Sequence, residues 1–127
     1  MKLVCSLFIA LALVGAPAYA QDKQAPAEVT PSEARAWIQL FDKIVDAVVA
    51  NKDDCDHMAG GINTIVDANQ RTIAMARDAK AKGKRLPASA QQHMLDGMRR
   101  MVAALDKCGR DEKVSLAFKR IDLGNRG

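Results

Sequence analysis

Apolar residues recur at intervals of three and four in the first third of the chain, a spacing that places them on one face of an α-helix. The residues before this stretch are typical of a helix start. Thr30 suits the N-cap, Pro31 suits the first helical position, and Glu33 completes a capping box. The pattern predicts a first helix over residues 31–50. Its apolar face comprises Ala34, Trp37, Ile38, Phe41, Ile44, Val45, Val48 and Val49.

A second helix is predicted from about residue 54 to residue 82. Asp53 or Asp54 caps its start, and Gly83 ends it. The pair Gly60-Gly61 lies in its early turns and predicts either a kink or a close contact with another helix, because glycine weakens a helix by about 1 kcal/mol relative to alanine. The apolar face comprises Cys55, Met58, Ile62, Ile65, Val66, Ile73 and Ala76.

Two further helices follow. Ser89 and Gln92 have the spacing of a capping box at the start of the third. Asp111 suits the N-cap of a short fourth helix, which Gly124 closes. Along the third helix, apolar residues alternate in steps of four and three, as in a coiled-coil seam, and this seam comprises Met94, Met98, Met101, Leu105 and Cys108.

The first twenty residues have the features of a cleavable export signal. A lysine at position 2 precedes an apolar run over residues 3–14, and a small-x-small cleavage site ends at Ala20. The run is too short to stay in a bilayer as an anchor, so none is expected in the mature chain. We expect a bacterial periplasmic or extracellular protein, with a flexible linker over residues 21–29, a helical domain over 30–124 and a tail over 125–127.

The cysteines add a covalent constraint. Of the three cysteines, Cys5 leaves with the signal, and Cys55 and Cys108 remain. Two thiols in an exported chain predict a disulfide. If the second and third helices pair antiparallel, a Cys55–Cys108 bridge centres their turn near residue 82, where Gly83 independently places it. The sequence therefore predicts an all-α, up-down-up-down bundle of three long helices and a short fourth with one disulfide.

Composition and missing motifs exclude several functions. The net charge is +4, too small to indicate nucleic-acid binding, and the only tryptophan is Trp37. No Cys-x-x-Cys-His motif is present for covalent haem, and the carboxylates cluster at helix ends instead of on the seams where a di-iron site would need them. No phosphate loop, nucleophile elbow or His-Glu-x-x-His motif occurs. We therefore expect no cofactor and no enzymatic activity.

The favoured function is that of a binding or interaction module. The short fourth helix covers only part of the bundle, which predicts an apolar contact surface beside the basic residues Lys82, Lys84 and Arg85. Such a surface suits an anionic amphiphile, a lipid or a partner helix. The candidate contact residues are Trp37, Phe41, Ile73 and Met94.

Two metal sites are alternatives. Imidazole and thioether groups suit Cu(I), and such groups occur together in His93, Met94, Met98 and Met101, although a methionine stripe at helical spacing is also typical of plain core. His57 between acidic neighbours could bind a divalent metal or simply pair with a helix cap. An enzyme without a recognisable motif is the third hypothesis.

Overall fold

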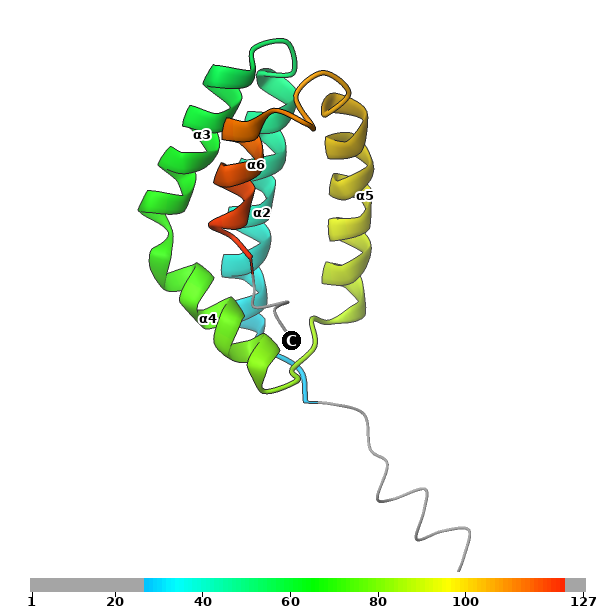
Figure 1. The fold of residues 1–127 in the computed structure, drawn as a ribbon. Helices are drawn as coiled ribbons and strands as arrows, with labels where there is room; N and C mark the ends of the chain where they lie inside the picture. The colour runs from blue at the N-terminus through cyan, green and yellow to red at the C-terminus, as the bar shows by residue number, and fades with distance from the viewer. Residues whose placement is uncertain (1–26, 123–127) are drawn as a thin grey trace, which may run out of the picture.

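The computed structural model describes residues 27–122, which form five α-helices (Figure 1). The predicted all-helical class is confirmed: the only β-type pairing among these residues is an isolated bridge between Glu28 and Arg85. Gly124 and the predicted signal and tail lie outside the described residues. The helices are α2 (Pro31–Ala50), α3 (Cys55–Ala68), α4 (Gln70–Ala81), α5 (Ala88–Ala104) and α6 (Glu112–Lys119).

The first helix, α2, begins as the sequence predicts. The Thr30 hydroxyl accepts from the Glu33 backbone N–H at 3.1 Å, and the Glu33 carboxylate accepts from the Thr30 N–H at 3.0 Å. This reciprocal pair satisfies two backbone donors that a helix start leaves free. The buried residues of α2 form the largest contribution of any helix to the core: Ala34, Trp37, Leu40, Phe41, Ile44, Val45 and Val48.

The predicted second helix is two helices, because the chain breaks at Asn69 and not at the glycine pair. In an unbroken helix, the backbone N–H groups of residues 69 and 70 would bind the carbonyls of Ile65 and Val66. At the break, the side-chain amides of Asn69 and Gln70 bind those two carbonyls instead, each at 2.8 Å. The Asn69 backbone N–H also donates to the Val66 carbonyl, at 3.2 Å, so the carbonyls before the break keep hydrogen-bond partners. The glycine pair instead lies at a contact between helices, the other predicted possibility, since a Cβ built on Gly61 lies 3.6 Å from the Ala47 Cβ of α2.

The predicted pairing of the second and third helices is wrong. Of the helices that the structure describes, only α2 packs against α5, while α6 packs against α3. The seam of α5 is also shifted, because its buried residues are Gly97, Met101 and Ala104, and Met98 is 46 % exposed. The small residues Gly97 and Ala104 take the buried positions that the coiled-coil pattern assigns to Met98 and Leu105. Gly97 lets α5 approach the Phe41 ring of α2 closely.

The predicted capping box of the third helix is also wrong. The N-cap of α5 is Pro87, and no side chain caps it. The Gln92 amide instead lies 3.3 Å from the Asp96 carboxylate one turn later. Helix α5 therefore begins one residue before Ser89, and its stability comes from packing on α2 instead of from a cap.

Helix α6 starts at its predicted cap, with the Asp111 carboxylate accepting from the Val114 N–H at 3.1 Å. It ends at Lys119, earlier than the sequence predicts. The Arg120 guanidinium then bonds Asn63 and Asp67 on α3. These contacts hold the end of α6 against α3.

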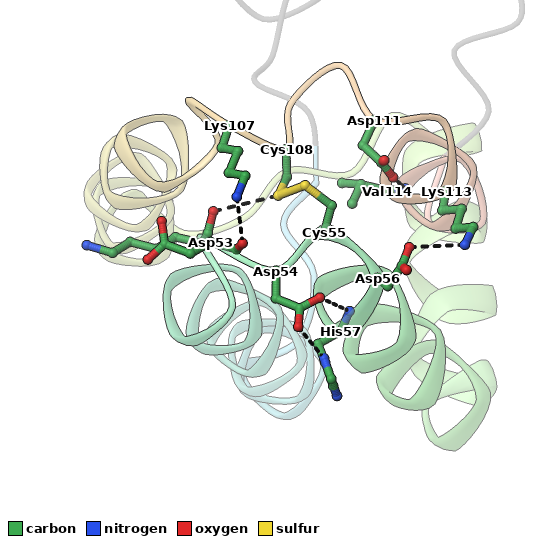
Figure 2. The surroundings of a disulfide bond; sticks show 11 residues. Asp53, Asp54, Cys55, Asp56, His57, Lys107, Cys108, Asp111, Lys113 and Val114 are labelled. Carbon is green, nitrogen blue, oxygen red and sulfur yellow. Dashed lines mark hydrogen bonds and ion pairs between the residues drawn. A yellow bond between two sulfur atoms is a disulfide. The ribbon is translucent and has the colours of Figure 1, made fainter.

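A disulfide joins Cys55 and Cys108, as predicted, with their Cα atoms 5.3 Å apart (Figure 2). Cys108 lies in the connection after α5, not on the helix, and this connection reaches the start of α3. Polar contacts surround the bridge in Figure 2: the Lys107 ammonium donates to the Asp53 carbonyl at 3.0 Å, and Lys113 pairs with Asp56 at 3.0 Å. The bridge thus fastens α5 to the end of the bundle at which α3 and α6 begin.

The last residues of the predicted linker are fixed to the domain. The Val29 N–H donates to the Arg85 carbonyl, and the Arg85 N–H donates to the Ala27 carbonyl, both at 2.9 Å. Val29 is 8 % exposed and packs with Ala34, Ala79 and Leu86. The helical domain therefore includes residues 27–29, while residues 21–26 lie outside the described part.

Removing the disulfide should destabilise the fold strongly. The bridge joins cysteines 53 residues apart. In the chain-entropy model, closing such a loop lowers the conformational entropy of the unfolded chain and stabilises the fold by about 4 kcal/mol. We expect the double variant Cys55→Ser, Cys108→Ser to lose about 2–4 kcal/mol in urea unfolding followed by circular dichroism. An unchanged unfolding midpoint would show that the bridge does not form.

Alanine at two helical glycines should have opposite effects. A Cβ on Gly97 would overlap the Phe41 ring and lie 3.3 Å from a Val45 methyl, so Gly97→Ala should cost about 1–2 kcal/mol after the gain in helix propensity. Gly60 has open space around its Cα, so the matched variant Gly60→Ala should gain about 0.5–1 kcal/mol. Thermal unfolding of both variants tests this, and stabilisation by Gly97→Ala would contradict the close approach of α5.

Candidate ligand-binding site

A cavity of about 470 Å³ lies at the end of the molecule where α4 ends and α5 begins. We call it the basic-end cavity. Its apolar walls come from the start of α2, from α4 and from the turn that follows α4. The apolar lining residues are Val29, Trp37, Met75, Ala76, Ala79 and Leu86.

Local backbone features shape this cavity. The break at Asn69 lets α4 take a different direction from α3 and pack against α2 (Figure 1). Gly83, at φ +70°, ends α4 in the left-handed conformation that glycine adopts at little cost. The bridge between Glu28 and Arg85 then holds the turn beside the start of α2. Three separate elements are thus fixed around one space.

The charged residues lining the cavity are mainly cationic. Lys80, Lys84 and Arg85 line it together with one acid, Glu33. The Glu33 carboxylate is engaged by the Thr30 backbone N–H and hydroxyl, which lower its pKa, and the charge of Lys84 lowers it further. Glu33 therefore stays ionised, but three cationic residues outnumber this one carboxylate, so the net charge of the lining favours an anion.

Trp37 forms part of the cavity wall and is anchored by a sulfur contact. Its indole N–H donates to the Met94 thioether at 3.3 Å, which joins α2 to α5. The residue is 9 % exposed. As the only tryptophan in the chain, it provides a fluorescent reporter inside the candidate site.

A second cavity of about 280 Å³ lies on another side of Trp37. We call it the central cavity. Trp37 and Lys80 border both cavities, and Asp122 is the other charged residue that borders the central one. Its apolar lining residues are Trp37, Phe41, Ile44, Met101, Phe118 and Ile121.

The four predicted contact residues have different positions. Trp37 lines both cavities, and Phe41 lines the central one. Met94 is partly buried behind the Trp37 indole. Ile73 is only 1 % exposed and belongs to the core, so its side chain does not offer a contact surface.

The residues of the copper alternative have four different environments. His93 pairs with Asp42 at 2.6 Å, Met94 contacts Trp37, Met98 faces solvent, and Met101 is buried. Between residues 27 and 122, no three His, Cys, Asp or Glu side chains are grouped so as to hold a metal ion.

His57 belongs to a helix cap. The Asp54 carboxylate accepts from the His57 backbone N–H at 3.0 Å, and its second oxygen lies 2.5 Å from Nδ1 of the imidazole (Figure 2). These two contacts lower the pKa of Asp54, and the hydrogen bond and charge of Asp54 raise the pKa of His57. The pair lies at the opposite end of the molecule from the basic-end cavity.

Several cavity residues were not predicted from the sequence, notably Val29, Met75 and Leu86. For Val29, the sequence did contain a signal that it packs against the domain. Val29 precedes the N-cap Thr30, and an apolar residue there often packs against the fourth helical residue, here Ala34, as a hydrophobic staple. Met75 carried no such signal, because its exposure depends on the bend at Asn69.

The comparisons with known proteins give no relative for this chain: no family model, curated protein or solved structure matches it. Within the described residues, no helix has both the length and the apolar character needed to cross a bilayer.

The imidazole of His57 should titrate above its ordinary value of 6.5. Because folding raises this pKa, the stabilisation from the pair is present below pH 6.5 and is lost as the pH rises through the folded value. Asn is also a good N-cap, so Asp54→Asn keeps the cap but should bring the pKa of His57 down towards 6.5. NMR titration of the imidazole protons measures both values, with Asp56→Asn as a control expected to have a smaller effect. Equal midpoints in the wild type and Asp54→Asn would contradict the pairing.

Proposed function

We propose that this protein is an exported, non-enzymatic binding module for a small anionic amphiphile. The observation that carries the proposal is an apolar cavity of about 470 Å³ lined by Lys80, Lys84 and Arg85. Its volume falls in the range of small-molecule sites, about 300–1,000 Å³. An alkyl group would occupy the apolar walls, and a carboxylate or phosphate would lie near the cations.

The distribution of charge favours an anion over a neutral or cationic ligand. The Glu33 carboxylate already accepts a hydrogen bond from the Thr30 N–H, and the three cationic residues of the lining outnumber it. Lys84 and Arg85 are brought to the cavity by the backbone bridge to residues 27–29. A bound anion would therefore meet cations held by a fixed turn, which reduces the ordering cost of binding.

The proposal also includes export of the mature chain. Residues 1–20 are proposed to be removed as a signal, which delivers the mature chain to a bacterial periplasm or to the exterior. A Cys55–Cys108 disulfide is compatible with such an oxidising compartment. The folded domain would then meet amphiphiles outside the cytoplasm.

A short fatty acid should bind the oxidised protein and change the fluorescence of Trp37. We expect decanoate to bind more tightly than decan-1-ol at pH 7.5, because only decanoate carries a charge. The double variant Lys84→Gln, Arg85→Gln should weaken decanoate binding about tenfold at low salt, since an exposed ion pair contributes up to about 1 kcal/mol. The affinity for decan-1-ol should stay unchanged.

A matched control removes the same charge elsewhere. Lys43→Gln, Arg71→Gln also lowers the net charge by two, but neither residue lines the basic-end cavity. This variant should bind decanoate like the wild type. Absence of binding by both ligands would refute the proposal, and equal weakening in both double variants would place the anion elsewhere.

The copper alternative is tested on the same protein. In competition for Cu(I) against a chelator probe, the wild type and the Met98→Leu, Met101→Leu variant should show the same apparent Cu(I) affinity. A loss of Cu(I) binding in that variant would favour the metal-handling function over the proposed one.

A further inference from the structure

The two cavities follow one another along a single stripe of α2. The basic-end cavity touches Glu33 and Trp37, and the central cavity touches Trp37, Phe41 and Ile44. Steps of four, four and three residues keep these side chains on one side of a helix. With a rise of about 1.5 Å per residue, the stripe from Glu33 to Ile44 is about 16 Å long. The cavities therefore form a series with Trp37 at their junction.

Trp37 separates the two cavities. The one hydrogen bond of its side chain goes to the Met94 sulfur, and a thioether is a weak acceptor. The indole is otherwise held by apolar packing in the core, which an alkyl chain passing beside it would have to replace. The side chain borders both spaces, so a displaced ring would connect them.

We infer that the ligand is a long single-chain anionic amphiphile, whose alkyl chain runs from the basic-end cavity past Trp37 into the central cavity. This inference rests on the proposed function and extends it by naming the ligand class. The head group lies near Lys84 and Arg85, and the chain follows the α2 stripe. The distal part of the chain then contacts Phe41, Met101 and Phe118, which are apolar.

A single chain fits this arrangement better than a branched or two-chain lipid. Of their lining residues, the two spaces share only Trp37 and Lys80, so a chain that enters both must pass at this one point. The smaller, distal space has a volume of about 280 Å³, in keeping with the end of one alkyl chain. The cationic residues Lys84 and Arg85 line only the first cavity, which sets the direction of the chain.

Bromine scanning tests the path of the chain directly. Bromine quenches indole fluorescence on contact, and Trp37 is the only tryptophan. Hexadecanoates brominated near the carboxylate, at mid-chain or near the methyl end are titrated into the oxidised wild-type protein. We expect the mid-chain bromine to quench most strongly. Strongest quenching by the methyl-end or carboxyl-end bromine would overturn the inference.

Chain-length dependence provides a second test. In the wild type, affinity should rise about fourfold per added methylene from decanoate to hexadecanoate, because each methylene is removed from water. Ile121→Phe fills the central cavity from a partly exposed position after the end of α6. This variant should bind decanoate normally but gain little affinity for longer chains. Leu116→Phe adds similar volume at an exposed site on α6 and should match the wild type.

The outcomes separate the two proposals. If no fatty acid of any length binds, the proposed function fails. If decanoate binds, but affinity stops rising at the same chain length in the wild type and in Ile121→Phe, only the path into the central cavity fails. Circular dichroism of Ile121→Phe checks that it folds, and the bromine scan needs no variant at all.

Discussion

The structure depends on burying the apolar side of α2. Helices α3, α4 and α5 all pack against this one helix, and α6 is held through α3. Gly97 lets α5 approach α2 closely, because a Cβ at that position would overlap the Phe41 ring, and Gly61 on α3 lies against Ala47 at ordinary van der Waals distance. Both cavities border α2, between Glu33 and Ile44. The packing that stabilises the domain therefore also determines where the cavities lie.

Much of the fold could be predicted from local patterns. The capping box at Thr30, the caps at Asp54 and Asp111, and the glycine stop at Gly83 are decided by a few adjacent residues. Such signals are strong because backbone donors at helix starts need partners within one turn. The disulfide was also predictable, because only two cysteines remain after the proposed signal. The helix pairing used to support it was wrong, since the connection after α5, and not the helix itself, carries Cys108 to α3.

The errors arose where long-range packing decides the outcome. The methionine spacing on α5 favours a seam through Met98, but Gly97 and Ala104 occupy it, because Phe41 needs the space that a glycine leaves. Similarly, the two glycines of α3 suggested a kink, whereas the bend occurs at Asn69, where side-chain amides can replace backbone donors. For the candidate site, Trp37 and the basic turn were predictable from the sequence, and Val29 had the signal of a hydrophobic staple. Met75 had no such signal, because its place in the cavity wall depends on that bend.

The position of the disulfide in the chain has a consequence for resistance to proteolysis. The covalent loop from Cys55 to Cys108 contains α3, α4 and α5, together with the turn that carries Lys84 and Arg85. A single proteolytic cut anywhere within this loop would leave both fragments linked. The exposed basic turn, which is an obvious substrate for proteases that cleave after lysine or arginine, lies inside the loop. A nicked molecule would therefore keep all its helices in one covalent unit.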